Sequence, residues 1–523
     1  MIKKFFLLIV ACMLLYSCVG CSEKRPESRD TDQVSSEEKA EGQKEFPTIV
    51  WQIYDESQEL GERFADIWQA SLDRLLRERG VPYRVKIEVY YESIKDGKQY
   101  SPAQALENFK AEGKQADVIS IPTIMTEWDA NGKNLYAYFP YREMIQKNLL
   151  EPLDSILETE QGVRIKEAIT QTELKRSQVN GVTYGIAQHM RTFNAVAYRK
   201  DILKKYEIEH EELSADIFEN EDLLKKVRDG EEGKVIPYIM DGGVLRRIGV
   251  WIIDECEILA CSREGSFVNV FETEELKKSL DKLKDFQDQG LINTSDQSSG
   301  DFFAIDYYVD TDQIYESVYK VYKDGKGEEE IDIVVVPNEK LPQLALYGAD
   351  SATGIASWSK HQKEALDFLT LLYTDADIAN LIQYGVEGVN YSVENGYAIY
   401  GKHNMLSIYG KHFTNPLLTY PGEGMPRDRR AMLEQCYKEN EAHMPNGFRF
   451  DPEPVQKEID AIAEIFGSYG EYTEEARQLL SGNVDDPDAA LEVFNQKLKA
   501  AGADKIVSEA NRQLAEWREK YEG

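Results

Sequence analysis

In the first third of the chain, β-rich runs alternate with segments in which apolar residues repeat at the helical period. β-rich runs at Thr48–Tyr54, Arg84–Tyr91 and Ala116–Ile121 predict strands. Between them, apolar residues recur every three or four positions over Leu60–Arg79 and Pro102–Glu112, which predicts amphipathic helices. Strands that alternate with helices form parallel sheets with helices on their faces. The pattern therefore predicts an α/β fold, whose ligands bind where the carboxyl ends of the strands meet.

Helical periodicity returns towards the carboxyl end of the chain. Thr273 is a candidate N-cap before two acidic residues, and Gly290 ends the helix that follows. A further helix is predicted to begin at Asp486, which precedes a proline. In the last segment, apolar residues from Val507 to Tyr521 repeat at alternating steps of three and four, and we interpret this stripe as core.

The amino-terminal residues predict export and a lipid anchor. Two lysines precede the apolar run Phe5–Tyr16, which is too short to span a membrane permanently, so residues 1–17 are typical of a signal peptide. A leucine three positions before Cys18 and a small residue directly before it resemble the lipobox of bacterial lipoproteins. Cys18 is therefore predicted to carry the lipid, with Cys21 as the alternative. Secretion without a lipid is the competing interpretation.

Residues 18–45 are predicted to form a flexible tether. They contain no aromatic residue and almost no branched aliphatic one, so they cannot bury enough surface to offset the entropy of ordering. Folded structure is expected from about Phe46 onward, and its length suggests two or three domains.

The net charge of the chain argues against anionic partners. With 61 basic and 94 acidic residues the chain carries a formal charge of −33. Phosphate binding needs a positive field, so nucleic acid is excluded as a partner, and a polybasic membrane patch is excluded on the same ground.

Cysteine and motif content argue against a catalytic or metal-dependent protein. Cys256 and Cys261 could pair across a turn or remain buried free thiols, and the chain has no disulfide framework. Phosphate-loop, zinc-protease, nucleophile-elbow and EF-hand motifs are all missing from the sequence. We predict no enzyme activity and no cofactor, and we place no metal site, although the sequence does not decide whether calcium is bound.

Several segments, taken in order, resemble the extracellular solute-binding proteins of ABC importers, in particular their carbohydrate-type group. The most specific are Asn180–Ala187 and Ala197–Tyr206, in which Ala187 stands where the family usually has proline. The other matching segments are Ala116–Ile119, Leu150–Asp154, Gly354–Ala356, Lys363–Leu369 and, similar to a lipoprotein subgroup, Gly385–Tyr391, Gly447–Asp451 and Lys497–Ile506.

The resemblance implies two α/β lobes that close on a ligand by a hinge. The chain would cross between lobes near 188–193, 345–353 and 388–394. The implied division is residues 46–190 plus 350–390 for lobe 1 and residues 191–349 plus 391–523 for lobe 2.

Candidate ligand contacts follow from the chemistry of sugars. Sugar rings need flat aromatic faces for stacking and carboxylate or amide groups for their hydroxyls, placed at strand ends and at the hinge. The candidates are Tyr54, Asp55, Glu56, Trp128, Gln188, Arg191, Tyr238, Asp241, Trp251, Tyr307, Glu387 and Tyr391.

Other interpretations of these residues remain open. Trp251 lies in an apolar run and could belong to the core, and Tyr307 could simply alternate across a strand. Asp55 and Glu56 could favour the amino terminus of the helix that follows them.

The resemblance implies a monomeric, lipid-anchored receptor outside the cytoplasm. It would capture a carbohydrate, expected to be an oligosaccharide, and deliver it to the transmembrane subunits of an ABC permease. One alternative is a surface sensor or binding protein for a non-sugar solute such as a peptide. Another is a secreted glycosidase.

Overall fold

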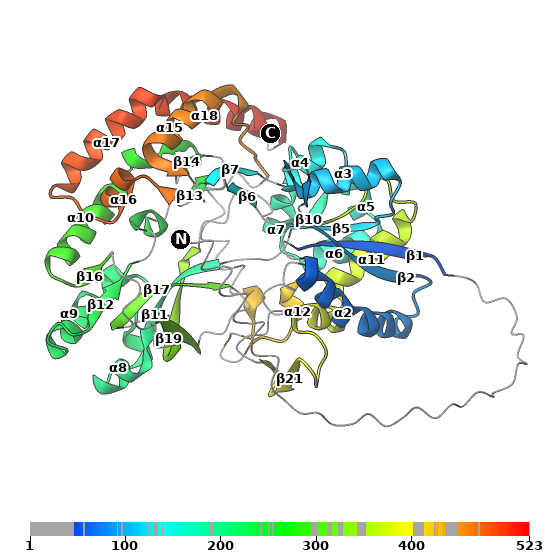
Figure 1. Cartoon of the computed structure of the whole chain (residues 1–523), viewed down its shortest axis with the longest axis horizontal. Coiled ribbons are helices and arrows are strands. Elements are labelled where there is room, and N and C mark those ends of the chain that lie inside the picture. Colours follow the sequence, from blue (N-terminus) through cyan, green and yellow to red (C-terminus); the bar gives the residue numbers. More distant parts are fainter. Residues whose placement is uncertain are drawn as a thin grey trace, which may run out of the picture.

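The computed structural model describes most of the chain after the amino-terminal segment. The described residues are 46–55, 58–91, 93–95, 98–122, 125–128, 134–138, 140–187, 192–240, 243–248, 251–253, 256–262, 264–294, 301–310, 316–322, 328–342, 352–400, 413–422, 425, 427–431, 434, 447–468 and 471–521. They form two α/β bodies side by side, each built around its own sheet (Figure 1).

The first sheet has five strands in the order β10-β20-β5-β1-β2. Its strands are β1 (Thr48–Tyr54), β2 (Arg84–Tyr90), β5 (Val118–Ile121), β10 (Gly185–Ala187) and β20 (Ala352–Ile355). β1 pairs in parallel with both β2 and β5, whereas β20 runs antiparallel to both β5 and β10. Six of the seven residues of β1 are buried, as expected for a central strand that is covered on both faces.

Helices cover both faces of this sheet. They are α2 (Gln58–Glu78), α3 (Pro102–Glu112), α4 (Pro140–Gln146), α5 (Asp154–Leu157), α6 (Glu160–Ala168), α7 (Gln171–Arg176), α11 (Gln362–Thr374) and α12 (Ala376–Tyr384). α3 shows how local sequence sets an element: Ser101 caps its first turn, and Gly113 ends it at a φ of 69°. We call the described residues between 46 and 187 and between 352 and 434 the first lobe.

The second sheet has six strands in the order β16-β12-β17-β11-β19-β18. They are β11 (Thr192–Arg199), β12 (Ile236–Ile239), β16 (Ile292–Asn293), β17 (Phe302–Asp310), β18 (Glu316–Tyr322) and β19 (Glu328–Pro342). The helices of this part of the chain are α8 (Lys200–Lys205), α9 (Glu221–Gly230) and α10 (Glu274–Asp288). We call the described residues between 192 and 342 and between 447 and 521 the second lobe.

Short strands and hairpins complete the two lobes. In the first they are β3 (Ser93–Lys95), β4 (Lys98–Tyr100), β6 (Met125–Trp128), β7 (Asn134–Tyr138), β8 (Gln178–Val179), β9 (Val182–Thr183), β21 (Tyr391–Glu394) and β22 (Tyr397–Tyr400). In the second they are β13 (Trp251–Ile253), β14 (Cys256–Cys261), β15 (Phe267–Asn269), β23 (Gly467–Ser468) and β24 (Glu471–Tyr472).

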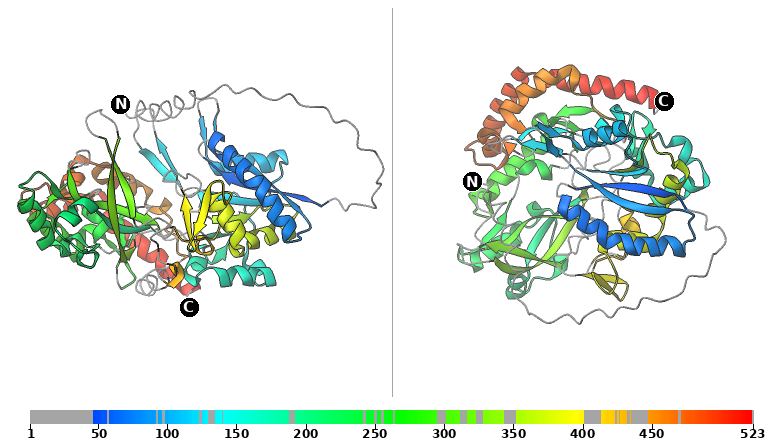
Figure 2. Two further views of the ribbon diagram at one scale, coloured as in Figure 1. Left: turned by 90° about the horizontal axis from the view of Figure 1, so that it is seen from below. Right: turned by 45° about the vertical axis from the view of Figure 1, so that its right-hand side comes forward.

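The carboxyl-terminal helices belong to the core of the second lobe. They are α15 (Gln456–Phe466), α16 (Glu474–Leu480), α17 (Pro487–Ala501) and α18 (Ala503–Tyr521). They arch over this lobe, and α18 ends beside the first lobe (Figures 1 and 2). The predicted stripe of α18 is core, since Ala510, Leu514 and Trp517 are buried in the same cluster as α10.

The predicted elements of the first lobe are confirmed to within about two residues at each end. The predicted N-cap at Thr273 is also confirmed, because its side chain accepts a hydrogen bond from the backbone N–H of Leu276 at 3.3 Å. Asp486 caps α17 in the same way. These agreements show that the α/β fold class is correct.

The third crossing predicted near 388–394 was misplaced. Residues 391–400 form the β21–β22 hairpin, and its Tyr391 packs on Tyr384 of α12 in the first lobe. The chain is still in the first lobe at Arg430, which donates hydrogen bonds to the backbone carbonyls of Glu167, Ala168 and Ile169. It has entered the second lobe by Phe448, whose ring lies 5.5 Å from that of Phe267. The passage therefore lies between residues 434 and 447.

Candidate functional site

One edge of the first sheet gathers five strand ends. The register aligns Tyr54 at the end of β1 with Tyr90 at the end of β2. On the other side of β1, the pairing of Trp51 with Val118 brings Ile121 level with Tyr54. Ile121 pairs with Ala352, and Ala352 pairs with Ala187. The carboxyl ends of β1, β2, β5 and β10 and the amino end of β20 thus share one edge.

One edge of the second sheet is organised in the same way. β11 begins at Thr192, which pairs with Asp310 at the end of β17, and Phe193 pairs with Pro342 at the end of β19. β12 runs parallel to both β16 and β17, so it points towards the same edge, but it ends level with Ile305, before the end of β17.

Two connections between the lobes leave from these edges. One joins Ala187 of β10 to Thr192 of β11, and the other joins Pro342 of β19 to Ala352 of β20. The edges at which these strand ends meet therefore lie at the same pair of connections. In open α/β sheets, ligands bind outside the carboxyl ends of the strands, so we take these edges as the candidate site.

Tyr54 and Asp55 lie at the edge of the first sheet, but both are largely buried, at 7% and 3% exposure. The Tyr54 ring contacts Tyr90 edge-on at 5.5 Å. Asp55 packs beside the first turn of α2, where a Cβ on Gly61 would stand 2.7 Å from the Asp55 Cβ. This placement agrees with the alternative interpretation that the carboxylate favours the helix amino terminus.

Tyr238 does not lie at the candidate edge of the second sheet, because it is level with Ala304 of β17. It is fully buried in the core of the second lobe, and its hydroxyl donates a hydrogen bond to Asp306 of β17. We therefore drop it from the candidate set. Tyr307 pairs with Ala195 and is partly buried against the cluster around Ile305, so it keeps one face towards solvent.

Tyr391 begins the β21–β22 hairpin of the first lobe, and Glu387 lies four residues before it, so neither is at a crossing. Glu387 is exposed, whereas Tyr391 is 7% exposed and its ring centre lies 5.3 Å from that of Tyr384. Burial, followed by the neighbouring Glu387 carboxylate, raises the pKa of the Tyr391 phenol to about 12. A neutral hydroxyl with a raised pKa can donate a hydrogen bond at any physiological pH.

The side chains of the remaining candidates lie outside the part of the chain that the structure describes. Glu56, Gln188, Arg191 and Asp241 lie outside the described residues. Trp128 ends β6 and Trp251 begins β13, but their side chains lie outside the description as well.

The question left open for the cysteines is answered by the structure. Cys256 and Cys261 are buried at the two ends of β14 and form no disulfide. Within the described ranges, no group of three or more His, Cys, Asp or Glu side chains is placed to hold a metal ion.

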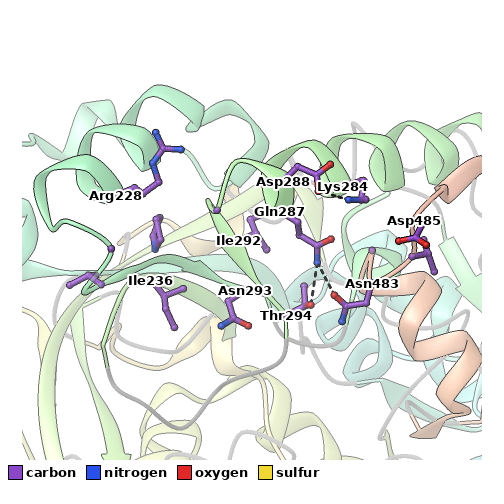
Figure 3. Close-up of a pocket in the computed structure, with 16 residues that line it drawn as sticks. Arg228, Ile236, Lys284, Gln287, Asp288, Ile292, Asn293, Thr294, Asn483 and Asp485 are labelled. Atoms are coloured by element: carbon purple, nitrogen blue, oxygen red, sulfur yellow. Dashed lines mark hydrogen bonds and ion pairs between the residues drawn. The ribbon is translucent and has the colours of Figure 1, made fainter.

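A separate groove of about 630 Å³ runs along the edge strand β16 (Figure 3). Ile236 and Ile292 line its apolar part, and Gln287 anchors its polar part by donating a hydrogen bond to the Ser481 carbonyl at 2.6 Å. Its sixteen lining residues are all described and include no aromatic side chain, so the groove offers no stacking face for a sugar ring. The strand edges at the crossings remain the stronger candidate site.

Sequence reasoning missed one polar residue at this edge. Asn194 lies on β11 two residues after the first connection, and its side chain is 7% exposed. Its position in a β-rich run gave no signal, because an amide inside a strand looks like an ordinary surface residue in the sequence.

The two lobes, their separate sheets and the paired crossings define a two-lobed solute-binding protein. The chain belongs to the bacterial extracellular solute-binding protein family, whose model matches residues 121–399. A second model, for a domain of unknown function, matches residues 445–519. The family membership predicted from sequence is confirmed.

Known relatives support the same conclusion. A carbohydrate ABC transporter substrate-binding protein of Streptococcus pneumoniae serotype 4 is 23% identical over 396 residues, which cover 71% of this chain and 77% of the relative. The N-glycan transport solute-binding protein NgtS of S. pneumoniae shares the fold at a TM-score of 0.59 and 21% identity, covering 90% of this chain and 99% of NgtS. In complex with Man1GlcNAc, NgtS gives a TM-score of 0.55 at 20% identity, covering 91% of this chain and 100% of NgtS.

No described helix is both long and apolar enough to span a membrane.

Proposed function

We propose that this protein captures an oligosaccharide between its two lobes and delivers it to the transmembrane subunits of an ABC importer. The observation that carries the proposal is the convergence of strand ends from both sheets at the two crossings. A solute bound there would touch both lobes, so it would stabilise their closed arrangement. Relatives named as carbohydrate and N-glycan binding proteins support a sugar as the solute.

The proposed binding residues come from both lobes. Tyr54, Asp55 and Tyr307 lie on the two strand edges, and Glu387 and Tyr391 contribute from the first lobe. Glu56, Trp128, Gln188, Arg191, Asp241 and Trp251 stay predictions. The protein binds its solute without chemical turnover and acts as a monomer.

A thermal-shift screen tests the proposal. High-mannose and other oligosaccharides are compared with short peptides and amino acids. A ligand at a hundred times its Kd should stabilise the protein by about 2.7 kcal/mol and raise its melting temperature by several degrees. A shift with oligosaccharides alone supports the proposal, and a shift with peptides alone replaces carbohydrate by peptide.

Loss of oligosaccharide uptake in a deletion strain separates transport from sensing, and release of shortened sugars would reveal a glycosidase.

We further propose that the lipid on Cys18 holds the protein at the outer face of the cell membrane. Two or three acyl chains would anchor it firmly, because each buried methylene contributes about 0.8 kcal/mol. The Cys18→Ala variant is expected to appear in the culture medium, while Cys21→Ala stays with the membrane fraction. Immunoblots of both fractions measure this, and the reverse pattern would assign the lipid to Cys21.

A further inference from the structure

The carboxyl-terminal segment, residues 447–521, belongs to the core of the second lobe. The Phe448 ring lies 6.0 Å from that of Trp517. Asn511 of α18 exchanges hydrogen bonds with both backbone groups of Phe267 on β15, at 2.8 and 2.9 Å. Whatever moves the second lobe must therefore move this segment with it.

The same segment contacts the first lobe at the end of α7. Arg449 donates a hydrogen bond from Nη2 to the carbonyl of Arg176, the last residue of α7, at 3.0 Å. The last carbonyls of a helix lack partners within the helix, and a cation there also meets the negative end of the helix dipole. Gly447 lies against the same turn, where a Cβ would stand 3.1 Å from the carbonyl oxygen of Lys175.

A second contact joins the lobes at the tip of the β8–β9 hairpin. Gly181 has a φ of 76°, and a Cβ added to it would lie 2.3 Å from the ring of Tyr521. The ring of Tyr521 is in turn 6.0 Å from that of Trp517, so it is continuous with the second lobe's core. Only a glycine lets the hairpin and this ring approach so closely.

Both contacts are tied to the first crossing. Ser177, the residue after α7, accepts a hydrogen bond at its Oγ from the backbone N–H of Ala187, at 2.7 Å. Ala187 is the last residue of β10, directly before the connection to the second lobe. Tyr141 adds a second tie, since its hydroxyl donates to the Ser177 carbonyl at 2.8 Å. One short helix end therefore holds both the start of the crossing and the carboxyl-terminal segment.

From this arrangement we infer that Arg449 and Tyr521 are positioning residues that hold the pivot of the two lobes at the end of α7. This gives a role to the segment that matches a domain of unknown function: it ties the lobes together beside the first crossing. Contacts close to a rotation axis move little when the lobes close, so they restrict the direction of the motion without opposing it. The inference does not depend on the identity of the solute.

Single-molecule energy transfer in the full-length chain, purified in detergent, tests the pivot. The dyes are placed through noncanonical residues at Arg77 of α2 and Lys278 of α10, which are exposed and lie on different lobes. In the unsubstituted chain the distance distribution is expected to be narrow. Arg449→Ala is expected to broaden it, and Arg449→Lys to restore it, because an ammonium group can donate to the same carbonyl.

Matched variants keep the test decisive. Arg512→Ala removes an exposed arginine of α18 that forms ion pairs with Glu509 and Glu516 of its own helix, so the distribution should not change. Gly181→Ala inserts a methyl group into the Tyr521 contact and removes no atom from the second lobe. Gly80→Ala is its control, since Gly80 has a φ of 68° but nothing within 4 Å of an added Cβ.

The expected outcome is broadening in Arg449→Ala and Gly181→Ala, with Arg512→Ala and Gly80→Ala like the unsubstituted chain. If Arg449→Ala does not fold, the glycine pair decides. Unchanged distributions in both test variants would overturn the inference, as would equal broadening in the controls.

Discussion

Replacing Trp51 with alanine is expected to lower the free energy of unfolding of the first lobe by about 3–5 kcal/mol. Trp51 is fully buried on the central strand β1. Its ring stacks on Trp68 at 6.2 Å and meets Phe368 and Phe413 edge-on, at 5.4 and 6.0 Å. Its indole N–H donates to Ser120 Oγ at 2.9 Å. The alanine variant would lose all of these contacts and leave a cavity that the surrounding rings cannot close.

Calorimetry measures this loss. For a lobe of this size the transition is expected to fall by roughly 10 °C. Trp358→Ala is the matched control, because Trp358 is only partly buried and its indole N–H donates to the Lys114 carbonyl at the surface of the same lobe. Equal losses in the two variants would contradict the central role of Trp51.

Asp117→Ala is expected to cost about 3 kcal/mol of unfolding free energy, whereas Asp117→Asn should cost less. Asp117 is fully buried. Its Oδ2 accepts hydrogen bonds from the backbone N–H of Val50 at 2.8 Å and from Gln115 Nε2 at 2.7 Å, and its Oδ1 accepts one from Ser359 Oγ. Alanine would leave the buried N–H of Val50 without this acceptor.

The asparagine variant isolates the contribution of the hydrogen bonds. Its amide oxygen can still accept from Val50 and Gln115, while its NH₂ can donate to Ser359 Oγ. Urea unfolding of the three proteins measures the difference. If Asp117→Asn lowers the free energy of unfolding as much as Asp117→Ala, the negative charge of Asp117 and not its hydrogen bonding provides the stabilisation.

Local sequence patterns predicted most of the helices and strands of the first lobe, but few of the contacts at the candidate site. Elements such as β1 and α2 are predictable because their period is set by neighbours within a few residues. Tyr238 shows the opposite case. It follows an apolar run, as ligand contacts often do, but its hydroxyl is satisfied by Asp306, 68 residues further along the chain. No local pattern reveals such a partner.

The third crossing was misplaced for a related reason. The segment Gly385–Tyr391 resembles a family motif, and a turn followed by an alternating run reads equally well as a crossing or as a hairpin. The contact between Tyr391 and Tyr384 decides for the hairpin, and it depends on how α12 packs. Likewise, Arg449 becomes significant only when Arg176, 273 residues earlier, is placed beside it.

The position of β20 has a consequence for how the chain acquires its structure. β20 stands between β10 and β5, so β10 joins the first sheet only through residues 352–355. The amino-terminal half of the chain cannot complete its own sheet until the strands of the second lobe have already emerged. Such long-range pairing folds slowly. A chain that is exported in an extended form would thereby remain unfolded for most of its passage, and its first lobe would assemble only on the far side of the membrane.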